Sequence, residues 1–95
     1  MSVPFRFVHI GFCFAAQEPP VAELEKIFNT ALDWVRYDIH GWILYTNAEL
    51  DTWRDRIHNS PAIKEQDAFF LCEFGGGEYS GYQRKIVWDF LSKVR

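Results

Sequence analysis

Residues 79–95 combine positive charge with aromatic rings, a mixture that suits contact with nucleic acid. This stretch holds four Lys or Arg against one acidic residue, whereas the rest of the chain holds six against twelve. Arg84 and Lys85 stand close to Tyr79 and Tyr82. Proteins that bind single strands use such rings to stack on bases and such cations to pair with phosphates. These four residues are our candidate surface for nucleic acid or a protein partner, although a solvent-exposed helix face would explain the same charges.

Two histidines and two cysteines are the residues that a soft metal ion would choose: His9, Cys13, His40 and Cys72. No pair of them has the short spacing typical of zinc motifs, so we predict no metal site and no cofactor. Cys13 as a nucleophile would need a histidine base within reach. His9 lies on the same face of the same predicted strand but about 13 Å away. Free, buried thiols are therefore the simpler interpretation of both cysteines.

The glycine run at 75–77 is a further candidate, in this case for a phosphate-binding loop. No Gly-Lys-Ser/Thr follows it, and position 80, where a dinucleotide fingerprint needs glycine, is Ser80. We predict a flexible turn between a strand and a helix. Caps, turns and helix faces account for most of the aspartates, and their spacing selects no catalytic pair, so we name no catalytic residue. These aspartates are Asp33, Asp38, Asp51, Asp55, Asp67 and Asp89.

Length and composition indicate one globular domain over residues 1–95. The chain is 48% hydrophobic and 18% aromatic, which excludes intrinsic disorder. Its net charge of −3 excludes a protein that coats nucleic acid through bulk charge. No stretch approaches the roughly 18–20 apolar residues of a membrane span. The apolar start alternates with period two and carries Arg6 and His9, unlike a signal peptide. We expect a cytoplasmic protein without membrane contact.

The first half of the chain predicts a strand, a helix and a hairpin. Phe5–Phe14 is apolar on both alternating faces, as in a strand covered on both sides. Two prolines then precede a helical stripe, from which we expect a helix ending near Leu32. Trp34–Tyr37 and Trp42–Thr46 are rich in aromatic and β-branched residues, so we interpret them as a hairpin. One long helix running to Asp38 is the alternative.

The second half begins with a predicted helix. Thr46 and Glu49 have the spacing of a capping box, and the helix would follow them. Leu50, Trp53 and Ile57 recur at helical spacing, so they should line its inner face. Trp53 is therefore a predicted core anchor.

A strand over Asp67–Phe74 and a closing helix complete the predicted order. The closing helix carries an apolar stripe from Ile86 to Val94. Strand, helix, strand, strand, helix, strand is the order of the ferredoxin-like fold, a four-stranded antiparallel sheet with two helices on one face. We predict this α+β fold, with the third helix added at the C-terminal end.

Three segments of the chain resemble the small SinR-like proteins, relatives of the ferredoxin-like nuclease of CRISPR adaptation modules. They are WVRYDIHGWILYT, DAFFLCEF and GGGEYSGYQRKIVWDFLSK. In that family a Trp-containing strand pair ends in a capping threonine, an aspartate opens an apolar strand, and a Trp-aromatic-Leu segment ends the chain. Thr46, Asp67 and the segment 88–91 match those places. The resemblance implies the same fold and a related setting.

One departure from the family weakens the nuclease interpretation. The related nucleases carry an aspartate at the end of the first strand, where two copies can hold a metal, whereas this chain has Cys13 between two phenylalanines. A thiol substitutes poorly for the oxygen ligands that Mg²⁺ requires. We therefore expect a self-associating interaction or regulatory module without catalytic activity. Toxin–antitoxin, CRISPR and phage anti-defence systems would suit its size, and a metal-dependent endoribonuclease is the alternative.

The apolar surplus of the sheet predicts a homodimer. Two helices cover only one face of a four-stranded sheet, and a third helix about 20 Å long is too narrow for the other. An exposed apolar patch would then remain on the sheet, formed by Phe5, Phe7 and His9 or by their counterparts Phe69 and Leu71. A two-fold dimer would bury it, and we name Phe5, Phe7 and His9 as its candidate interface. A further protein partner would also suit such a surface.

Overall fold

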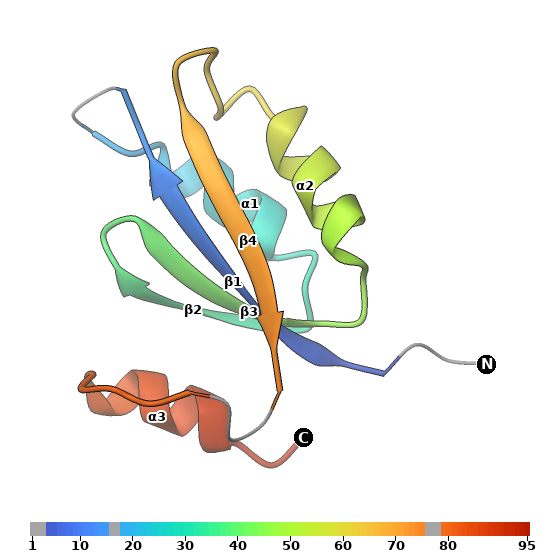
Figure 1. Cartoon of the computed structure of the whole chain (residues 1–95), viewed down its shortest axis with the longest axis vertical. Coiled ribbons are helices and arrows are strands. Elements are labelled where there is room, and N and C mark those ends of the chain that lie inside the picture. The colour runs from blue at the N-terminus through green and yellow to red at the C-terminus, as the bar shows by residue number, and fades with distance from the viewer. Residues whose placement is uncertain (1–3, 16–17, 76–78) are drawn as a thin grey trace.

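The protein is an α+β domain with one open, four-stranded antiparallel sheet and three helices (Figure 1). The computed structural model describes residues 4–15, 18–75 and 79–95. The elements follow the predicted order: β1 Arg6–Cys13, α1 Val21–Phe28, β2 Asp33–Asp38, β3 Gly41–Thr46, α2 Leu50–His58, β4 Ala68–Phe74 and α3 Lys85–Ser92. The strands lie side by side in the order β2-β3-β1-β4. None of the helices in the described ranges has the length and apolar character to cross a membrane.

The first helix is shorter than predicted. α1 ends at Phe28 rather than near Leu32, because the next turn tightens and the N–H of Thr30 bonds only three residues back. Leu32 then donates its N–H to the carbonyl of Tyr45, so the chain has already joined the sheet there. The predicted hairpin of β2 and β3 is confirmed, and the alternative of one helix to Asp38 is wrong.

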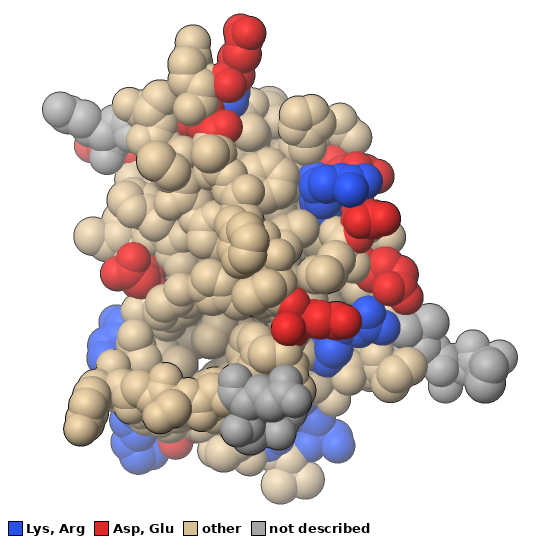
Figure 2. Space-filling model, in the orientation of Figure 1, with Lys and Arg blue, Asp and Glu red and all other residues tan. Residues whose placement is uncertain are grey.

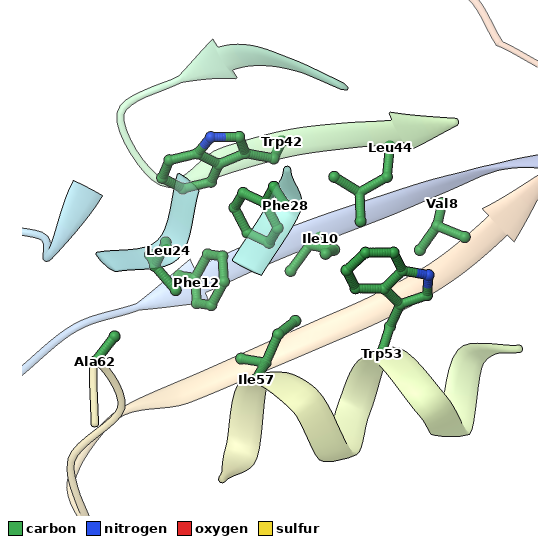
Figure 3. Close-up of a cluster of buried hydrophobic side chains, with 10 residues drawn as sticks. All are labelled: Val8, Ile10, Phe12, Leu24, Phe28, Trp42, Leu44, Trp53, Ile57 and Ala62. Atoms are coloured by element: carbon green, nitrogen blue, oxygen red, sulfur yellow. The ribbon is translucent and has the colours of Figure 1, made fainter. Parts of the chain in front are cut away.

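The larger core lies between the sheet and the helices α1 and α2. Alternate residues of β1 and β3 point into it, as the period of a strand requires. Trp53 from α2 and Phe28 from α1 fill its centre and are fully buried (Figure 3), which confirms the predicted role of Trp53. The buried members are Val8, Ile10, Phe12, Leu24, Phe28, Trp42, Leu44, Trp53, Ile57 and Ala62.

Thr46 does not form the predicted capping box. Its buried hydroxyl accepts hydrogen bonds from the N–H of Ala48 and from the indole N–H of Trp53, each at 3.1 Å. α2 begins later, at Leu50, with Glu49 as its N-cap residue and no side-chain cap. Thr46 therefore ties the end of β3 to the core tryptophan instead of capping the helix.

The opposite face of the sheet is partly covered by α3. Val87, Phe90 and Leu91 of α3 pack on Val35 and Ile43 of the sheet in a second, smaller core. In Figure 1, α3 lies at the lower left beside β2, and the ring of its Phe90 contacts that of Phe7, near the start of β1. α3 leaves the opposite end of this face open.

One assignment of strand faces has to be corrected. Phe69 pairs with Phe12 and Leu71 pairs with Ile10, and both pack in the larger core, on the side of α1 and α2. The β4 residues that share the α3 side with Phe7 and His9 are instead Phe74 and Cys72. The prediction placed β4 one residue out of register, because both of its faces are apolar and the sequence alone does not distinguish them.

Candidate functional site

A cavity of about 340 Å³ lies between α3 and the sheet. Figure 2 shows the molecule hollowed between α3, at the lower left, and the strands. The side chains in its lining that carry a polar atom are His9, Tyr37, Cys72, Tyr79, Ser80, Gln83 and Trp88. No charged side chain lines it among the described residues. Apolar concave sites with a few convergent polar groups are the usual form of small-molecule sites.

His9 and Tyr37 form the polar centre of this cavity. The Nε2 atom of His9 and the Oη atom of Tyr37 share a hydrogen bond, although 28 residues separate them in the chain. Gly41 permits this arrangement, because a Cβ at position 41 would lie 2.5 Å from the Cζ atom of Tyr37. The phenol ring of Tyr37 therefore packs over Gly41 at the β2–β3 turn, and its hydroxyl points toward His9 of β1.

Burial keeps both members of this pair uncharged near neutral pH. Desolvation lowers the pKa of His9 below its usual 6.5. Desolvation also raises the pKa of Tyr37, with a further contribution from the negative charge of Asp38. The pair therefore acts as a neutral donor–acceptor unit at physiological pH.

The lowered pKa of His9 predicts an acid-sensitive stability. The unfolded chain takes up this proton first as the pH falls below about 6.5, so the free energy of unfolding should fall from there through the folded pKa. Urea denaturation at about pH 7.5 and pH 5.5 should show a larger loss for the parent than for His9→Gln. His40→Gln, in the exposed turn between β2 and β3, is the matched control and should behave as the parent. Equal losses in the parent and in His9→Gln would contradict the prediction.

Cys72 lies directly opposite His9 in the pairing of β4 with β1. Both cysteines are free, as predicted, but neither is fully buried. Cys72 is half-buried in the cavity wall, and Cys13 is exposed because the last residue of β1 lies beyond the part of the sheet that α3 covers. No group of three or more His, Cys, Asp or Glu side chains that could hold a metal ion comes together within the described ranges.

The four candidate nucleic-acid residues do not form one surface. Tyr79 is turned inward, with its ring centroid 5.7 Å from that of Phe74 and 6.2 Å from that of Trp88. Tyr82, three residues later, is completely exposed. The structure therefore separates the two tyrosines that the sequence placed side by side.

The two candidate cations are engaged locally. Arg84 donates a hydrogen bond of 3.2 Å to the backbone carbonyl of Arg36 in β2. Lys85 forms an exposed ion pair of 2.8 Å with Asp89, one turn further along α3. Arg84 thus ties the start of α3 to the edge of the sheet.

The candidate interface residues on β1 lie in three different environments. Phe5 is 44% exposed and stacks on Tyr45 with ring centroids 5.1 Å apart. Phe7 lies beneath α3, within 6 Å of the rings of Tyr45, Phe74 and Phe90. His9 is half-buried against Tyr37, in the cavity. α3 therefore covers Phe7.

A second hollow, of about 570 Å³, follows the outer edge of β4. The three consecutive residues 69–71 line one side, and the exposed side of α2 lines the other. Phe70 is 66% exposed. The α2 side chains in this groove are Leu50, Asp51, Arg54, Asp55 and His58. Figure 2 shows an uncharged surface over the middle of β4, bordered on the right by mixed charges over α2.

Sequence reasoning missed Tyr37, Cys72 and the charged α2 side chains of the groove as site residues. Alternation within β2 would have placed Tyr37 on the same face as Val35, and Gly41 marks the turn against which it packs. The pairing of Cys72 with His9 needed the register of two strands far apart in the chain. That register has no local signal.

Comparison of the chain with protein-family models, with curated proteins and with solved structures found no match. The geometry of the two hollows is therefore the basis for a functional interpretation.

Proposed function

We propose that this chain is a self-associating interaction domain, without catalytic activity of its own, which forms a homodimer along the outer edge of β4. The observation that carries the proposal is the open edge of β4 beside a stripe of charged residues on α2, from Asp51 to His58. The acidic and basic residues of this stripe can pair with those of a second copy. A regulatory role, through a further protein partner of the dimer, belongs to the same proposal.

The edge of β4 has the features of a strand that pairs with another chain. β4 stands at one side of the sheet, spans seven residues, and holds Glu73 as its one charge and no proline. Within the described residues, no side chain donates to or accepts from its backbone. The other edge is different, because Arg84 bonds to the backbone of β2 and Asp33, Arg36 and Asp38 place charges along it. Charges of this kind discourage strand pairing.

The α2 stripe supports a second copy of the same chain as the occupant. Four charged or titratable residues line the side of α2 that faces the groove: Asp51, Arg54, Asp55 and His58. Their spacings of three, one and three residues place them on one face of the helix. Two β4 edges that pair about a two-fold axis bring two antiparallel α2 helices alongside each other. Asp51 of one copy then faces His58 of the other, and Arg54 faces Asp55. Each of these contacts occurs twice.

The same pairing would cover the exposed apolar surface. Phe70 points to the open end of the sheet, on the side of α3, and is mostly exposed. A continuous sheet of eight strands would place the two copies of Phe70 near each other and reduce the apolar area in water. The proposal thus moves the interface from Phe5, Phe7 and His9 to β4.

The proposal includes a ferredoxin-like arrangement and the likeness to SinR-like proteins. The βαββαβ order of the first six elements and the central position of β1 and β3 support it. Asp67, which matches the aspartate that opens a strand in that family, accepts hydrogen bonds from the backbone N–H groups of Ala15 and Lys64. These bonds lower the pKa of Asp67. The carboxylate therefore has a structural use at the start of β4.

A charge exchange on α2 tests the dimer. Arg54→Asp and Asp55→Arg should each turn two attractions into two repulsions and weaken the dimer about 10- to 100-fold. The double variant Arg54→Asp/Asp55→Arg restores opposite charges and should restore the dimer. Arg54 also pairs with Asp51 and Asp55 of its own chain at 3.2 Å, but all three side chains are more than half exposed. Exposed pairs contribute little to stability, so the variants should still fold, which circular dichroism can verify.

Sedimentation velocity across micromolar concentrations provides the measurement. The parent and the double variant should sediment at twice the 11.2 kDa of one chain, and each single variant should sediment as a monomer. A monomeric parent, or single variants that remain dimeric, would refute the β4 interface. Incubation of the parent with RNA and DNA in Mg²⁺ or Mn²⁺ should leave both intact, and cleavage that one Asp→Ala change removes would establish the endoribonuclease instead.

A further inference from the structure

We propose that the cavity between α3 and the sheet binds a small, uncharged, planar aromatic molecule that carries a hydrogen-bond acceptor, such as a carbonyl oxygen or a ring nitrogen. This site lies on the α3 side of the sheet, away from the α2 groove, and the inference does not depend on the proposed dimer.

The walls of the cavity favour a flat ring. Ile43 and Phe74 form the sheet side, and Val87, Trp88 and Leu91 form the helix side. A slot between a sheet and a helix, lined in this way, offers apolar contact to both faces of a ring. The volume of about 340 Å³ suits a molecule of one or two fused rings.

Tyr79 adds an aromatic end wall. Its ring meets Phe74 edge to face, with planes at 73°, and lies at 30° to the ring of Trp88. Such edge and face contacts are the arrangements that aromatic rings prefer. An aromatic ligand could therefore extend a cluster that the protein has already built.

Among the described residues, the His9–Tyr37 pair leaves one hydrogen-bond donor without a partner. If the hydroxyl of Tyr37 donates to Nε2 of His9, the Nδ1–H of the imidazole stays free. If instead Nε2–H of His9 donates, the hydroxyl proton of Tyr37 stays free. In either tautomer the neutral pair offers one donor, and an acceptor on the ligand would satisfy it. The lowered pKa of His9 keeps the pair in this neutral form at pH 7 and above.

The lining also selects against charge. An anion would find no Lys or Arg among the described lining residues, and a cation would find no Asp or Glu. A charged ligand would lose its hydration without gaining a partner, which is costly in a partly buried site. Ser80 and Gln83 are exposed at the mouth and can offer further neutral hydrogen bonds.

Three probes of nearly equal size separate the ring, the acceptor and the charge: naphthalene, quinoline and 2-naphthoate. Each is titrated at about pH 7.5 into the full chain, with binding followed by amide ¹⁵N–¹H chemical shifts. Quinoline should shift the amides of Ile43, Cys72 and Val87, and it should bind about 5- to 10-fold more tightly than naphthalene because it satisfies the free donor. 2-Naphthoate should bind more weakly than either.

Variants of the pair identify the donor. Because each member alone keeps one donor, Tyr37→Phe and His9→Phe should each retain a preference for quinoline. The double variant His9→Phe/Tyr37→Phe replaces both partners by apolar rings, a change that folded proteins tolerate better than removal of one. It should bind naphthalene and quinoline equally.

A filled cavity supplies a second, independent test. Cys72→Phe adds a ring to the cavity wall and should abolish binding of all three probes, whereas Ile86→Phe, on the exposed side of α3, should not. Shifts centred on Phe70 and α2, a preference for quinoline that survives in the double variant, or binding that survives in Cys72→Phe would overturn the proposal. Absence of any shift with quinoline at millimolar concentration would also overturn it.

Discussion

Trp53→Ala is expected to lower the free energy of unfolding by about 3–5 kcal/mol. The indole is fully buried, and it packs between α2 and the strand residues Val8 and Leu44 (Figure 3). Its N–H donates to the buried hydroxyl of Thr46, which would lose a partner. Domains of this size have about 5–15 kcal/mol of stability in total, so the variant should be largely unfolded well below the melting temperature of the parent.

Trp53→Phe is the matched control for this prediction. It keeps most of the apolar volume and removes the donor together with its hydrogen bond, so its cost should be smaller, about 1–2 kcal/mol. Urea denaturation followed by circular dichroism measures both variants. An alanine variant within about 1 kcal/mol of the parent would show that α2 presents a different face to the sheet.

Arg95→Ala is expected to release α3 from the sheet, at a cost of about 2–4 kcal/mol to its docking. The side chain is only 10% exposed. Its guanidinium bonds to Asp33 at 2.9 Å and to the carbonyl of Phe90 at 3.0 Å. It also lies 4.5 Å from the ring centroid of Tyr45 and 4.7 Å from that of Phe90. One side chain thus joins α3, β2 and β3.

Hydrogen exchange distinguishes release of α3 from global unfolding. In Arg95→Ala the amides of α3 should exchange at least about 30-fold faster, while the slowest amides of β1 and β3 change less. Arg95→Lys keeps the positive charge but loses the planar guanidinium group, so the increase in the exchange rate of the α3 amides should be intermediate. Lys93→Ala should have little effect, because Lys93 is 62% exposed and lies 3.6 Å from Asp33. Unchanged protection of α3 in Arg95→Ala would show that its apolar stripe suffices to hold it.

These two expectations concern the two layers of the protein separately. Trp53 holds the layer of α1 and α2, whose core is the larger. Arg95 holds α3, which also forms one wall of the cavity that His9 and Tyr37 line. Loss of α3 would therefore remove the cavity and leave the β4 groove, which belongs to the first layer.

The order of the elements could be predicted from the amino-acid sequence, because that order follows from local periodicity. Apolar residues at intervals of three and four predicted the inner face of α2, and Trp53 is buried as expected. The aromatic and β-branched residues before and after the turn at 39–40 predicted the hairpin of β2 and β3. Spacing of this kind needs no knowledge of distant parts of the chain.

How these elements pack against one another could not be predicted in the same way, because it depends on contacts between distant parts of the chain. The hydroxyl of Thr46 could have capped α2 or bonded to a core side chain. In the folded protein it accepts a hydrogen bond from the indole N–H of Trp53. β4 is apolar on both faces, so its pairing with β1, and not its own pattern, placed Cys72 opposite His9. His9 and Tyr37, which form a hydrogen bond, are 28 positions apart in the chain. Arg95 and Asp33, whose contact holds α3 on the sheet, are 62 positions apart. Such contacts arise from the register of strands and the packing of layers, which no short stretch of sequence encodes.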